Sequence, residues 1–327
     1  MKVVRRNFLK LAGIAVVAPA LPKFAIAMDY PARPSRIIVG FPPGGVTDIG
    51  ARMIGQWLSD HLGQPFLIEN KPGAGTQIAA ETAARAPGDG YTLLMSSSTN
   101  AINVSLYVEH NYDFINDLTP VAGVMRFPLV LVVHPSVPVK NVAELISYVK
   151  AHPGQLNLAS FGYGTGSHLA GELFKMMVGI KMAHVPYRGS APMLVDLIGG
   201  HVQTAFDNLP SSIEYIKTGQ LRALAVTTAT RLDILPDVPT LRETVPNYEA
   251  SSWIGVSAPA HTPTEIIDKL NKHINGCLLD PKIKEKIANM SAVALPGSAA
   301  DFGRLIAQDV KKWANVIRTA NITLDKT

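Results

Sequence analysis

The sequence predicts an α/β protein built as two halves, each a mostly parallel β-sheet flanked by helices. From Ser35 onward, short apolar runs alternate with segments of helical periodicity, and strands separated by helices of this length form βαβ units. The 327 residues are 47% apolar and only 17% charged, so the chain can bury a core large enough for two domains.

The first 27 residues predict an export signal that is cleaved from the mature protein. Arg5 and Arg6 precede an apolar run over residues 11–20, and a small-residue pattern ends at Ala27, where we expect cleavage. A membrane anchor is the alternative, but two prolines and a lysine interrupt the run well short of about 20 apolar residues. The paired arginines look like a twin-arginine signal, although Val4 stands where that pattern usually has serine, so general secretion stays open.

The charge balance of the mature chain excludes a strongly basic protein. Five of the 30 basic residues lie in the leader and no acidic residue does, which leaves 25 basic against 25 acidic residues. We therefore expect neither nucleic acid nor an anionic membrane surface as a partner. The single cysteine, Cys277, allows no intramolecular disulfide, and the nine histidines show no metal-ligand spacing, so no metal and no cofactor are expected.

The first half of the chain contains three predicted strands joined by helices. In order along the chain they are a strand at 36–41, a helix at 47–63, a strand at 65–71, a helix at 75–87 and a strand at 91–97.

The second half repeats the alternation without obvious sequence repetition. Its predicted strands lie at 128–135, 156–162, 182–187, 202–208 and 221–228, and its predicted helices at 141–153, 167–179 and 190–200.

A proline-rich loop then leads to a strand at 252–260 and to helices at 263–280 and 300–320. These two helices have no strands after them, so we expect them to pack back onto one of the halves. If it is the first half, the chain crosses between the halves twice, which makes a hinge and a cleft. The predicted lobes are residues 28–128 with 252–327, and residues 129–251.

The first candidate site is the strand-to-helix turn from Val39 to Arg52, "VGFPPGGVTDIGAR". Gly44 and Gly45 let the backbone approach a ligand, and the start of the next helix presents unpaired N–H groups and a partial positive charge. An anion is therefore the expected occupant. The alternative is an ordinary turn with a helix capped by a neighbouring side chain. The motifs that bind nucleoside triphosphates and dinucleotides are both absent.

The second candidate site, "ASFGYGTGSHLAGELF", repeats this design in the second half. A strand ends at Ser160, glycines follow at 162, 164 and 166, and a helix begins near Ser167. Two such loops facing each other across a cleft could hold one ligand between them.

Ser167 and His168 also raise an alternative hypothesis, an exported α/β hydrolase that would use them with Asp207. The surrounding residues do not form G-x-S-x-G, because Thr165 occupies the first glycine position. Adjacent side chains at a helix start also point in different directions. Ser167 is better explained as a helix cap or as a hydroxyl that contacts a ligand.

Nearly all of the mature chain resembles the Bug family of extracytoplasmic solute receptors, the binding proteins of tripartite tricarboxylate transporters. The resemblance lies in "YPARPSRIIVGFPPGGVTDIGAR", "IENKPGAGTQIAAETAARAPGDGYTLL", "SHLAGELFK", "VPYRGSAPMLVDLIGGHVQTAFDNLPSSIEYIKTGQLRALAVTT" and "LPDVPTLRE". It implies a monomeric, two-lobed periplasmic binding protein of the type II or Venus-flytrap kind, which holds a small carboxylate and catalyses nothing. The implied partners are a membrane permease or a signalling protein.

The resemblance also implies which residues bind. One ligand carboxylate meets both glycine loops, with backbone N–H groups, hydroxyls and ordered waters as the binding groups. The predicted ligand-binding residues are Phe41, Pro43, Gly44, Gly45, Val46, Thr47, Asp48, Ser97, Thr99, Ser160, Phe161, Gly162, Tyr163, Gly164, Thr165, Gly166, Ser167, His168, Tyr187 and Asp207.

Three of these residues favour a ligand more apolar than citrate. Val46 replaces the small or polar residue often found after the paired glycines, and Phe161 with Tyr163 makes the second loop unusually aromatic. We therefore expect an aromatic or longer-chain carboxylate.

Overall fold

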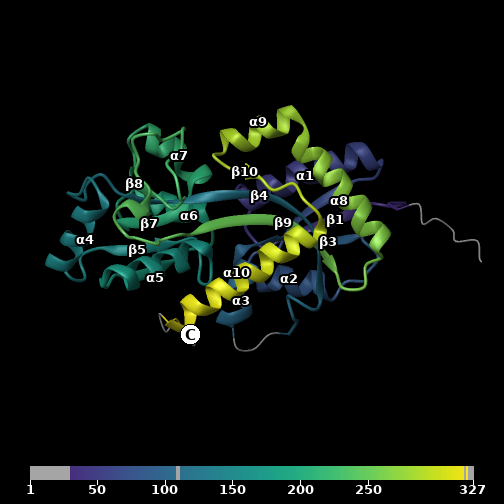
Figure 1. The fold of residues 1–327 in the computed structure, drawn as a ribbon, viewed down its shortest axis with the longest axis horizontal. Coiled ribbons are helices and arrows are strands. Elements are labelled where there is room, and N and C mark those ends of the chain that lie inside the picture. Colours follow the sequence, from purple (N-terminus) through teal and green to yellow (C-terminus); the bar gives the residue numbers. More distant parts are fainter. Residues whose placement is uncertain (1–29, 108–110, 320–321, 323–327) are drawn as a thin grey trace, which may run out of the picture. The chain divides into compact units, whose positions relative to one another are not determined.

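The structure is a computed structural model that describes residues 30–107, 111–319 and 322. The predicted export signal lies outside these residues. Figure 1 shows the helices and strands. The strands are β1 (Ser35–Val39), β2 (Phe66–Asn70), β3 (Thr92–Ser97), β4 (Leu118–Val133), β5 (Asn157–Ser160), β6 (Ala183–Pro186), β7 (Thr204–Asn208), β8 (Arg222–Val226), β9 (Ser251–Pro259) and β10 (Val293–Ala294).

Ten α-helices and two short 3₁₀ turns are found among the described residues. They are α1 (Val46–Leu62), η1 (Ala74–Thr76), α2 (Gln77–Ala84), α3 (Ser98–Leu106), α4 (Val142–Ala151), α5 (Gly166–Val178), α6 (Ser190–Ile198), α7 (Leu209–Lys217), η2 (Leu241–Glu243), α8 (Thr264–Leu279), α9 (Pro281–Asn289) and α10 (Ala299–Thr319). Within the described ranges no helix has both the length and the apolar character needed to cross a membrane.

The strands form two lobes that share β4. In the first lobe the order is β2-β1-β3-β9-β4, and in the second β4-β7-β5-β6, with β10 and β8 also paired to β4. The pairs β1–β2, β1–β3, β5–β6 and β5–β7 are parallel, as expected for βαβ units, whereas every pair that includes β4 or β9 is antiparallel. The sheets are thus mixed, with parallel strands carrying the loops and antiparallel strands linking the lobes.

β4 changes partners in its middle. It pairs with β9 up to Pro128 and with β7 from Leu129 onward. The sequence analysis predicted only the second part of β4, because the first part carries prolines and a glycine. The register of that part shifts between Pro120 and Ala122 and again between Gly123 and Met125, and such bulges accommodate residues that fit poorly in a regular strand.

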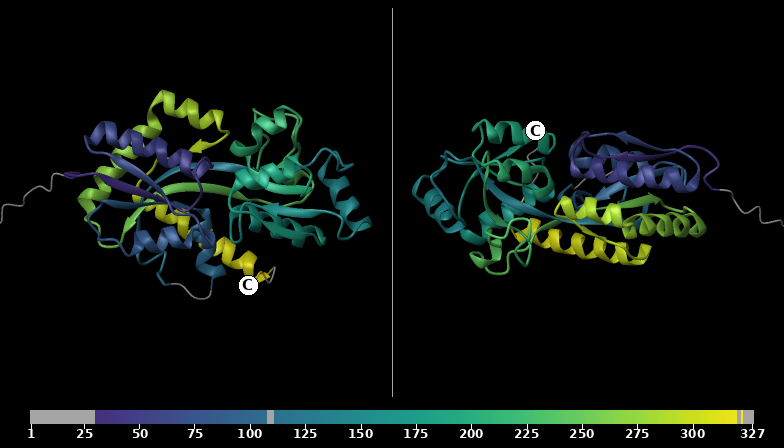
Figure 2. Two further views of the ribbon diagram at one scale, coloured as in Figure 1. Left: turned by 180° about the vertical axis from the view of Figure 1, so that it is seen from behind. Right: turned by 90° about the horizontal axis from the view of Figure 1, so that it is seen from above.

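Helix α10 packs on both lobes. Phe302 and Ile306 lie in a buried cluster of the first lobe, whereas Trp313 and Ile317, further along the helix, lie in the core of the second. The helix contacts α3 and β4 as well as α5 (Figures 1 and 2). The predicted assignment of residues 252–327 to one lobe therefore describes the start of α10 better than its end, and the exact lobe boundaries stay predictions.

Candidate functional site

A pocket lies where the carboxyl ends of β1, β3 and β7 meet the strands that link the lobes. Ligands of open α/β sheets bind at such strand ends. The pocket is lined by Phe41, Pro42, Pro43, Gly45, Val46, Thr47, Ser97, Ser98, Thr99, Phe127, Phe161, Arg188, Gly189, Ser190, Ala191, Pro192, Asn208, Ser252 and Trp253.

Four helices begin at this pocket. The residues that precede α1, α3, α6 and α7, namely Gly45, Ser97, Gly189 and Asn208, all line it. In the described structure the N-caps of α1, α6 and α7 supply no side-chain cap, whereas the N-caps of α4 and α9 accept backbone N–H groups through their side chains. The uncapped N–H groups and the positive ends of the helix dipoles therefore favour an anion in the pocket.

The rest of the lining is largely apolar. Phe41 and Phe161 meet edge to face with ring centroids 6.4 Å apart, and Phe127 and Trp253 add two further aromatic side chains. Among the described lining residues, Arg188 is the only charged one, and its side chain has no acidic partner there. The pocket thus suits an anion with an apolar body.

Asp48 holds the backbone of the first loop in place through hydrogen bonds. Its buried carboxylate accepts hydrogen bonds from the N–H of Gly44 (3.0 Å), from Arg52 (2.9 Å) and from Asn70 (2.9 Å). Burial alone would raise the pKa of Asp48, but the hydrogen bonds from Arg52 and Gly44 outweigh it and lower that pKa. Asp48 therefore holds the glycine turn in place and does not itself line the pocket.

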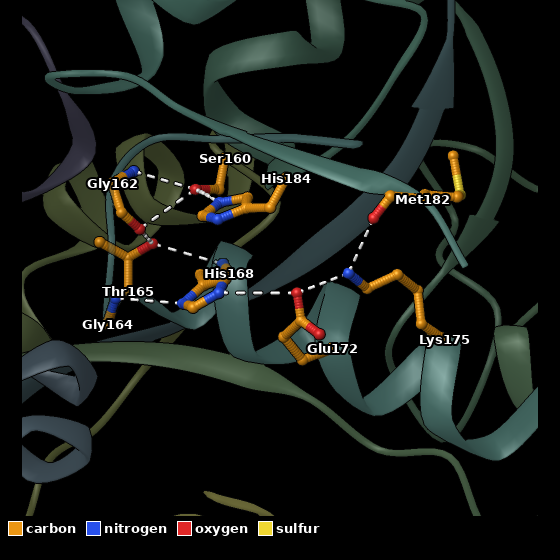
Figure 3. Close-up of polar contacts among 9 residues, drawn as sticks. All are labelled: Ser160, Gly162, Gly164, Thr165, His168, Glu172, Lys175, Met182 and His184. Carbon is orange, nitrogen blue, oxygen red and sulfur yellow. Dashed lines mark hydrogen bonds and ion pairs between the residues drawn. The ribbon is translucent and has the colours of Figure 1, made fainter. Parts of the chain in front are cut away.

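The polar side chains of the second loop are engaged with the loop's own backbone (Figure 3). Thr165 caps α5 by accepting the N–H of His168 (3.4 Å), and its hydroxyl donates to the carbonyl of Gly162 (2.6 Å). The N–H of Gly164 donates to Nδ1 of His168 (3.2 Å). These bonds fix the shape of the loop, and none of the four residues is among the pocket lining.

A stack of two histidines supports this loop from behind. The rings of His168 and His184 lie 4.1 Å apart, and Nε2 of His184 is 2.6 Å from the hydroxyl of Ser160 (Figure 3). Burial, followed by the charge of His168, lowers the pKa of His184 to about 3. His184 is therefore neutral at physiological pH and acts as a hydrogen-bonding support.

Glu172 anchors the other side of the stack. It lies 2.7 Å from Nζ of Lys175 and 3.6 Å from Nε2 of His168. Burial would raise the pKa of Glu172, but hydrogen bonds from His168 and Lys175 prevail and lower it to about 2. Lys175 also donates to the carbonyl of Met182 (3.1 Å), so the network joins α5 to the segment before β6.

The geometry does not assemble a hydrolase site. The hydroxyl of Ser167 donates to the carbonyl of Phe206, and no hydrogen bond joins Ser167 to His168 among the described residues. Asp207 accepts hydrogen bonds from Ser190 and Ser212 and none from a histidine. A nucleophile needs a base within hydrogen-bond reach, and this serine has none.

The sequence-predicted site residues fall into two groups. Eight of them line the pocket: Phe41, Pro43, Gly45, Val46, Thr47, Ser97, Thr99 and Phe161. The other twelve are not among the lining residues: Gly44, Asp48, Ser160, Gly162, Tyr163, Gly164, Thr165, Gly166, Ser167, His168, Tyr187 and Asp207. Tyr187, predicted as a wall, donates its hydroxyl to Asp196 (2.7 Å), and burial together with Asp196 raises its pKa to about 12. Whether any of these residues binds ligand stays a prediction.

The β6–α6 turn also contributes to the pocket, although the predicted site residues do not include its lining residues. Arg188, Gly189, Ser190 and the two residues that follow line the pocket. The signal was present in "VPYRGSAP", where an apolar strand, a glycine and a helix follow one another as in the two loops that were chosen. Gly189 has a φ of 112°, a conformation that favours glycine. No cluster of metal-ligating side chains occurs in the part of the chain that the structure describes.

Comparisons with known proteins agree with this architecture. The family model of the tripartite tricarboxylate transporter family receptor, TctC, matches residues 50–322. BugT of Bordetella pertussis is 39% identical over 97% of this chain and 98% of its own length.

Two solved structures of relatives contain ligands. The structure of R. palustris Rpa4515 with adipate is 41% identical in sequence to this chain and has a TM-score of 0.87. The match covers 90% of this chain and 99% of the Rpa4515 chain. The structure of MatC from Rhodopseudomonas palustris with bound malate is 30% identical in sequence to this chain and has a TM-score of 0.83. The match covers 88% of this chain and 100% of the MatC chain. These relatives are solute-binding receptors and not enzymes. The chain belongs to the Bug family of tripartite tricarboxylate transporter receptors.

Proposed function

We propose that this protein is a periplasmic receptor that captures a small carboxylate between its two lobes and delivers it to a tripartite transporter. The observation that carries the proposal is the convergence of four helix N-termini on one pocket, because such termini bind carboxylates. The relatives with adipate and with malate support the ligand class.

The lining suggests how the ligand is held. The carboxylate would accept hydrogen bonds from the uncapped first turn of α1, and Thr47 and Thr99, at the starts of α1 and α3, also offer hydroxyls. Phe41 and Phe161 would contact the apolar body of the ligand, which favours an aromatic or longer-chain carboxylate. Closure of the lobes around the ligand would exclude water and strengthen these interactions.

The cellular setting is part of the same proposal. The leader would direct export to the periplasm with cleavage near Ala27, by the twin-arginine or the general secretion route. The mature receptor would act as a monomer, and its closed form would be recognised by a membrane permease or by a signalling protein.

The first experiment is thermal unfolding of the mature protein against aliphatic and aromatic mono-, di- and tricarboxylates, after unfolding and refolding to remove any bound ligand. A ligand at 100 times its dissociation constant adds about 2.7 kcal/mol to the free energy of unfolding, which raises Tm by several degrees. If none of the carboxylates raises Tm although refolding is confirmed, the result would count against a carboxylate receptor.

A variant pair at Gly45 tests the role of the helix N-termini. Gly45 has the extended conformation of an N-cap (φ −82°, ψ 168°), and a side chain there would meet no described atom within 4 Å. Gly45→Asp should cap α1 and preserve stability while its negative charge abolishes carboxylate binding. Gly45→Asn is the matched control, because it caps without charge and should weaken binding far less. Equal affinities in the two variants would contradict the proposed anion site.

A further inference from the structure

Asp207 is a buried carboxyl group next to the pocket. It lies in β7 and has no exposed surface. Its hydrogen-bond donors among the described residues are the hydroxyls of Ser190 (2.8 Å) and Ser212 (2.6 Å) and the backbone of Asn208, all of them uncharged. Ser190 lines the pocket, so one hydroxyl separates the carboxyl group from the space where an anion is expected. A buried carboxylate without a cation beside it is costly, and protonation removes that cost.

The surroundings of Asp207 leave its charge without compensation. Burial raises the pKa of Asp207 to about 6, although the hydrogen bonds from Ser212, Ser190 and the backbone of Asn208 oppose the rise. β7 is packed against α5, α6, α7, β4 and β5. The titratable and charged side chains of these elements are His168, Glu172 and Lys175 on α5, Asp196 on α6, Glu214, Tyr215 and Lys217 on α7, and Arg126 on β4. Neither these groups nor Arg188 of the pocket lining is among the causes that shift the pKa of Asp207.

The protonation of Asp207 decides what Ser190 offers to the pocket. An ionised carboxyl group only accepts hydrogen bonds, so the proton of Ser190 is directed at Asp207 and its lone pairs remain for the pocket. A protonated carboxyl group can donate to Oγ of Ser190 instead, which frees the proton of Ser190 to point at a ligand. Asp207 is thus a positioning residue that acts on the ligand through Ser190.

A carboxylate ligand favours the protonated form of Asp207 for two reasons. Its negative charge repels a second negative charge held close by in a poorly hydrated site, and its oxygens accept the hydrogen bond that Ser190 can then donate. We propose that Asp207 is a proton-binding site coupled to the pocket, so that a carboxylate ligand and one proton bind together. The inference rests on the proposed function and adds the proton to it as a second ligand.

The coupled step moves one proton and changes no bond of the ligand. The proton comes from the solvent and forms an O–H bond on Asp207, and the hydroxyl of Ser190 turns from Asp207 to the ligand carboxylate. Because bound ligand raises the pKa of Asp207, the complex holds more protons than the free protein above pH 6, and affinity rises as pH falls toward 6. Below about pH 6, Asp207 is already protonated without ligand and the rise ends. The receptor therefore loads more tightly in mildly acidic surroundings.

The test is titration calorimetry of the refolded mature protein with adipate, malate and benzoate, whose carboxyl groups are ionised at pH 7. Each titration is repeated in buffers of different ionisation enthalpy, and the slope of the measured enthalpy against the ionisation enthalpy counts the protons taken up. A probe that binds at pH 7 should take up about 0.5–1 proton, and its affinity should rise about three- to tenfold between pH 8 and pH 7.

Asp207→Asn separates the coupling from a purely structural role. The amide keeps the size of the side chain and its NH₂ group can donate to Ser190 at every pH, so this variant imitates the protonated form. Proton uptake should vanish, and at pH 8 the probe should bind at least as tightly as to the unaltered protein, whereas loss of a merely structural group would weaken binding. If Asp207→Asn does not fold, Ser190→Ala removes the hydroxyl through which the proton acts and should flatten the dependence of affinity on pH.

Glu214→Gln is the matched control, because it removes a negative charge from an exposed position of α7. It should leave the proton uptake intact. Binding of a probe to the unaltered protein without proton uptake, or uptake that persists in Asp207→Asn, would overturn the inference and leave the carboxylate receptor standing. Failure of all three probes to bind would count against the proposed function and remove the inference with it.

Discussion

The two glycine-rich loops look alike in the sequence but use their glycines for opposite purposes. In the first loop, a Cβ on Gly44 or Gly45 would meet no described atom within 4 Å, so these glycines leave room in front of α1. In the second loop, a Cβ on Gly164 would come within 2.5 Å of Oδ1 of Asn103, and one on Gly166 within 2.7 Å of the hydroxyl of Ser252. The first pair leaves open space in front of α1, and the second allows close packing against α3 and β9.

This difference shows that glycine content alone does not identify a binding loop. Both loops connect a parallel strand to a helix, yet the N-cap of α1 is bare whereas Thr165 caps α5. A loop whose helix is already capped by its own side chain has fewer free N–H groups for an anion.

The largest effect should come from Gly164→Ala. The new Cβ would clash with Asn103 and Leu106, and the φ of +67° strains any side chain, so we expect a loss of about 3 kcal/mol in the free energy of unfolding. Gly154→Ala is the control, because its φ is +82° but its Cβ would meet no described atom within 4 Å; it should cost about 1 kcal/mol. Urea unfolding measures both, and equal losses would contradict the packing role of Gly164.

The network behind the second loop predicts a dependence of stability on pH. The pKa of Glu172 is about 2 in the folded protein against an ordinary 4.5, so its stabilisation is fully present above pH 4.5 and is lost as pH falls through 2. Glu172→Gln should therefore cost about 2 kcal/mol at pH 7, allowing for partial exposure, and flatten the stability curve below pH 4.5. Glu214→Gln, at an exposed ion pair, should change neither the free energy of unfolding at pH 7 nor its dependence on pH. An unaltered curve in Glu172→Gln would exclude this network as its source.

In the first loop, Gly45→Ala should affect ligand binding and leave stability almost unchanged, in contrast to the loss of stability expected for Gly164→Ala. Because its φ is −82° and the space beside it is open, the free energy of unfolding should change by less than about 0.5 kcal/mol. The methyl group occupies the space before α1, so ligand affinity should fall about tenfold, as measured by calorimetry. Gly276→Ala, which lies in α8 and meets only Trp57 at 3.8 Å, should leave affinity unchanged. Unchanged affinity in Gly45→Ala would place the ligand elsewhere.

The smallest effect concerns the contact between the two loops themselves. Phe41 and Phe161 meet edge to face across them, and such pairs contribute about 0.5–1.5 kcal/mol. A double-mutant cycle with Phe41→Leu and Phe161→Leu should give a coupling of about 0.5–1 kcal/mol in the free energy of unfolding. A coupling of zero would mean that the loops are apart in the unliganded protein.

The regular elements could be predicted from the sequence wherever apolar periodicity is strong. The predicted strand at 202–208 contains β7, and the one at 36–41 covers β1 except its first residue, Ser35. Helix α3 was not predicted, because "STNAINVSL" is rich in residues of low helix propensity and has no apolar stripe. Its burial and the capping contact between Asn100 and Ser97 compensate for the weak propensity.

The sequence predicted which loops form the site but not which of their side chains line the pocket. Both glycine loops were recognised, but which side chains face the pocket depends on the orientation of each strand end. At the end of β7, Asp207 was the predicted site residue, whereas its neighbour Asn208 lines the pocket and Asp207 is buried and bonded to Ser190. Successive side chains of a strand point to opposite faces, and the sequence alone does not reveal which face meets the ligand. Trp253 and Phe127 join the pocket because β4 and β9 cross beside it, a tertiary arrangement with no local signal.

The pairing of β9 between β3 and β4 also constrains the order of folding. Leu94 of β3 pairs with Ser257 of β9, so the sheet of the first lobe cannot close until the residues that follow the second lobe are available. All strand pairs of the second lobe, in contrast, form between β4 and β8. Since closing long loops slows folding, the second lobe can be native while β3 still presents an unpaired edge. Such an edge is a site for aggregation, so the newly made receptor is most vulnerable before β9 pairs with β3.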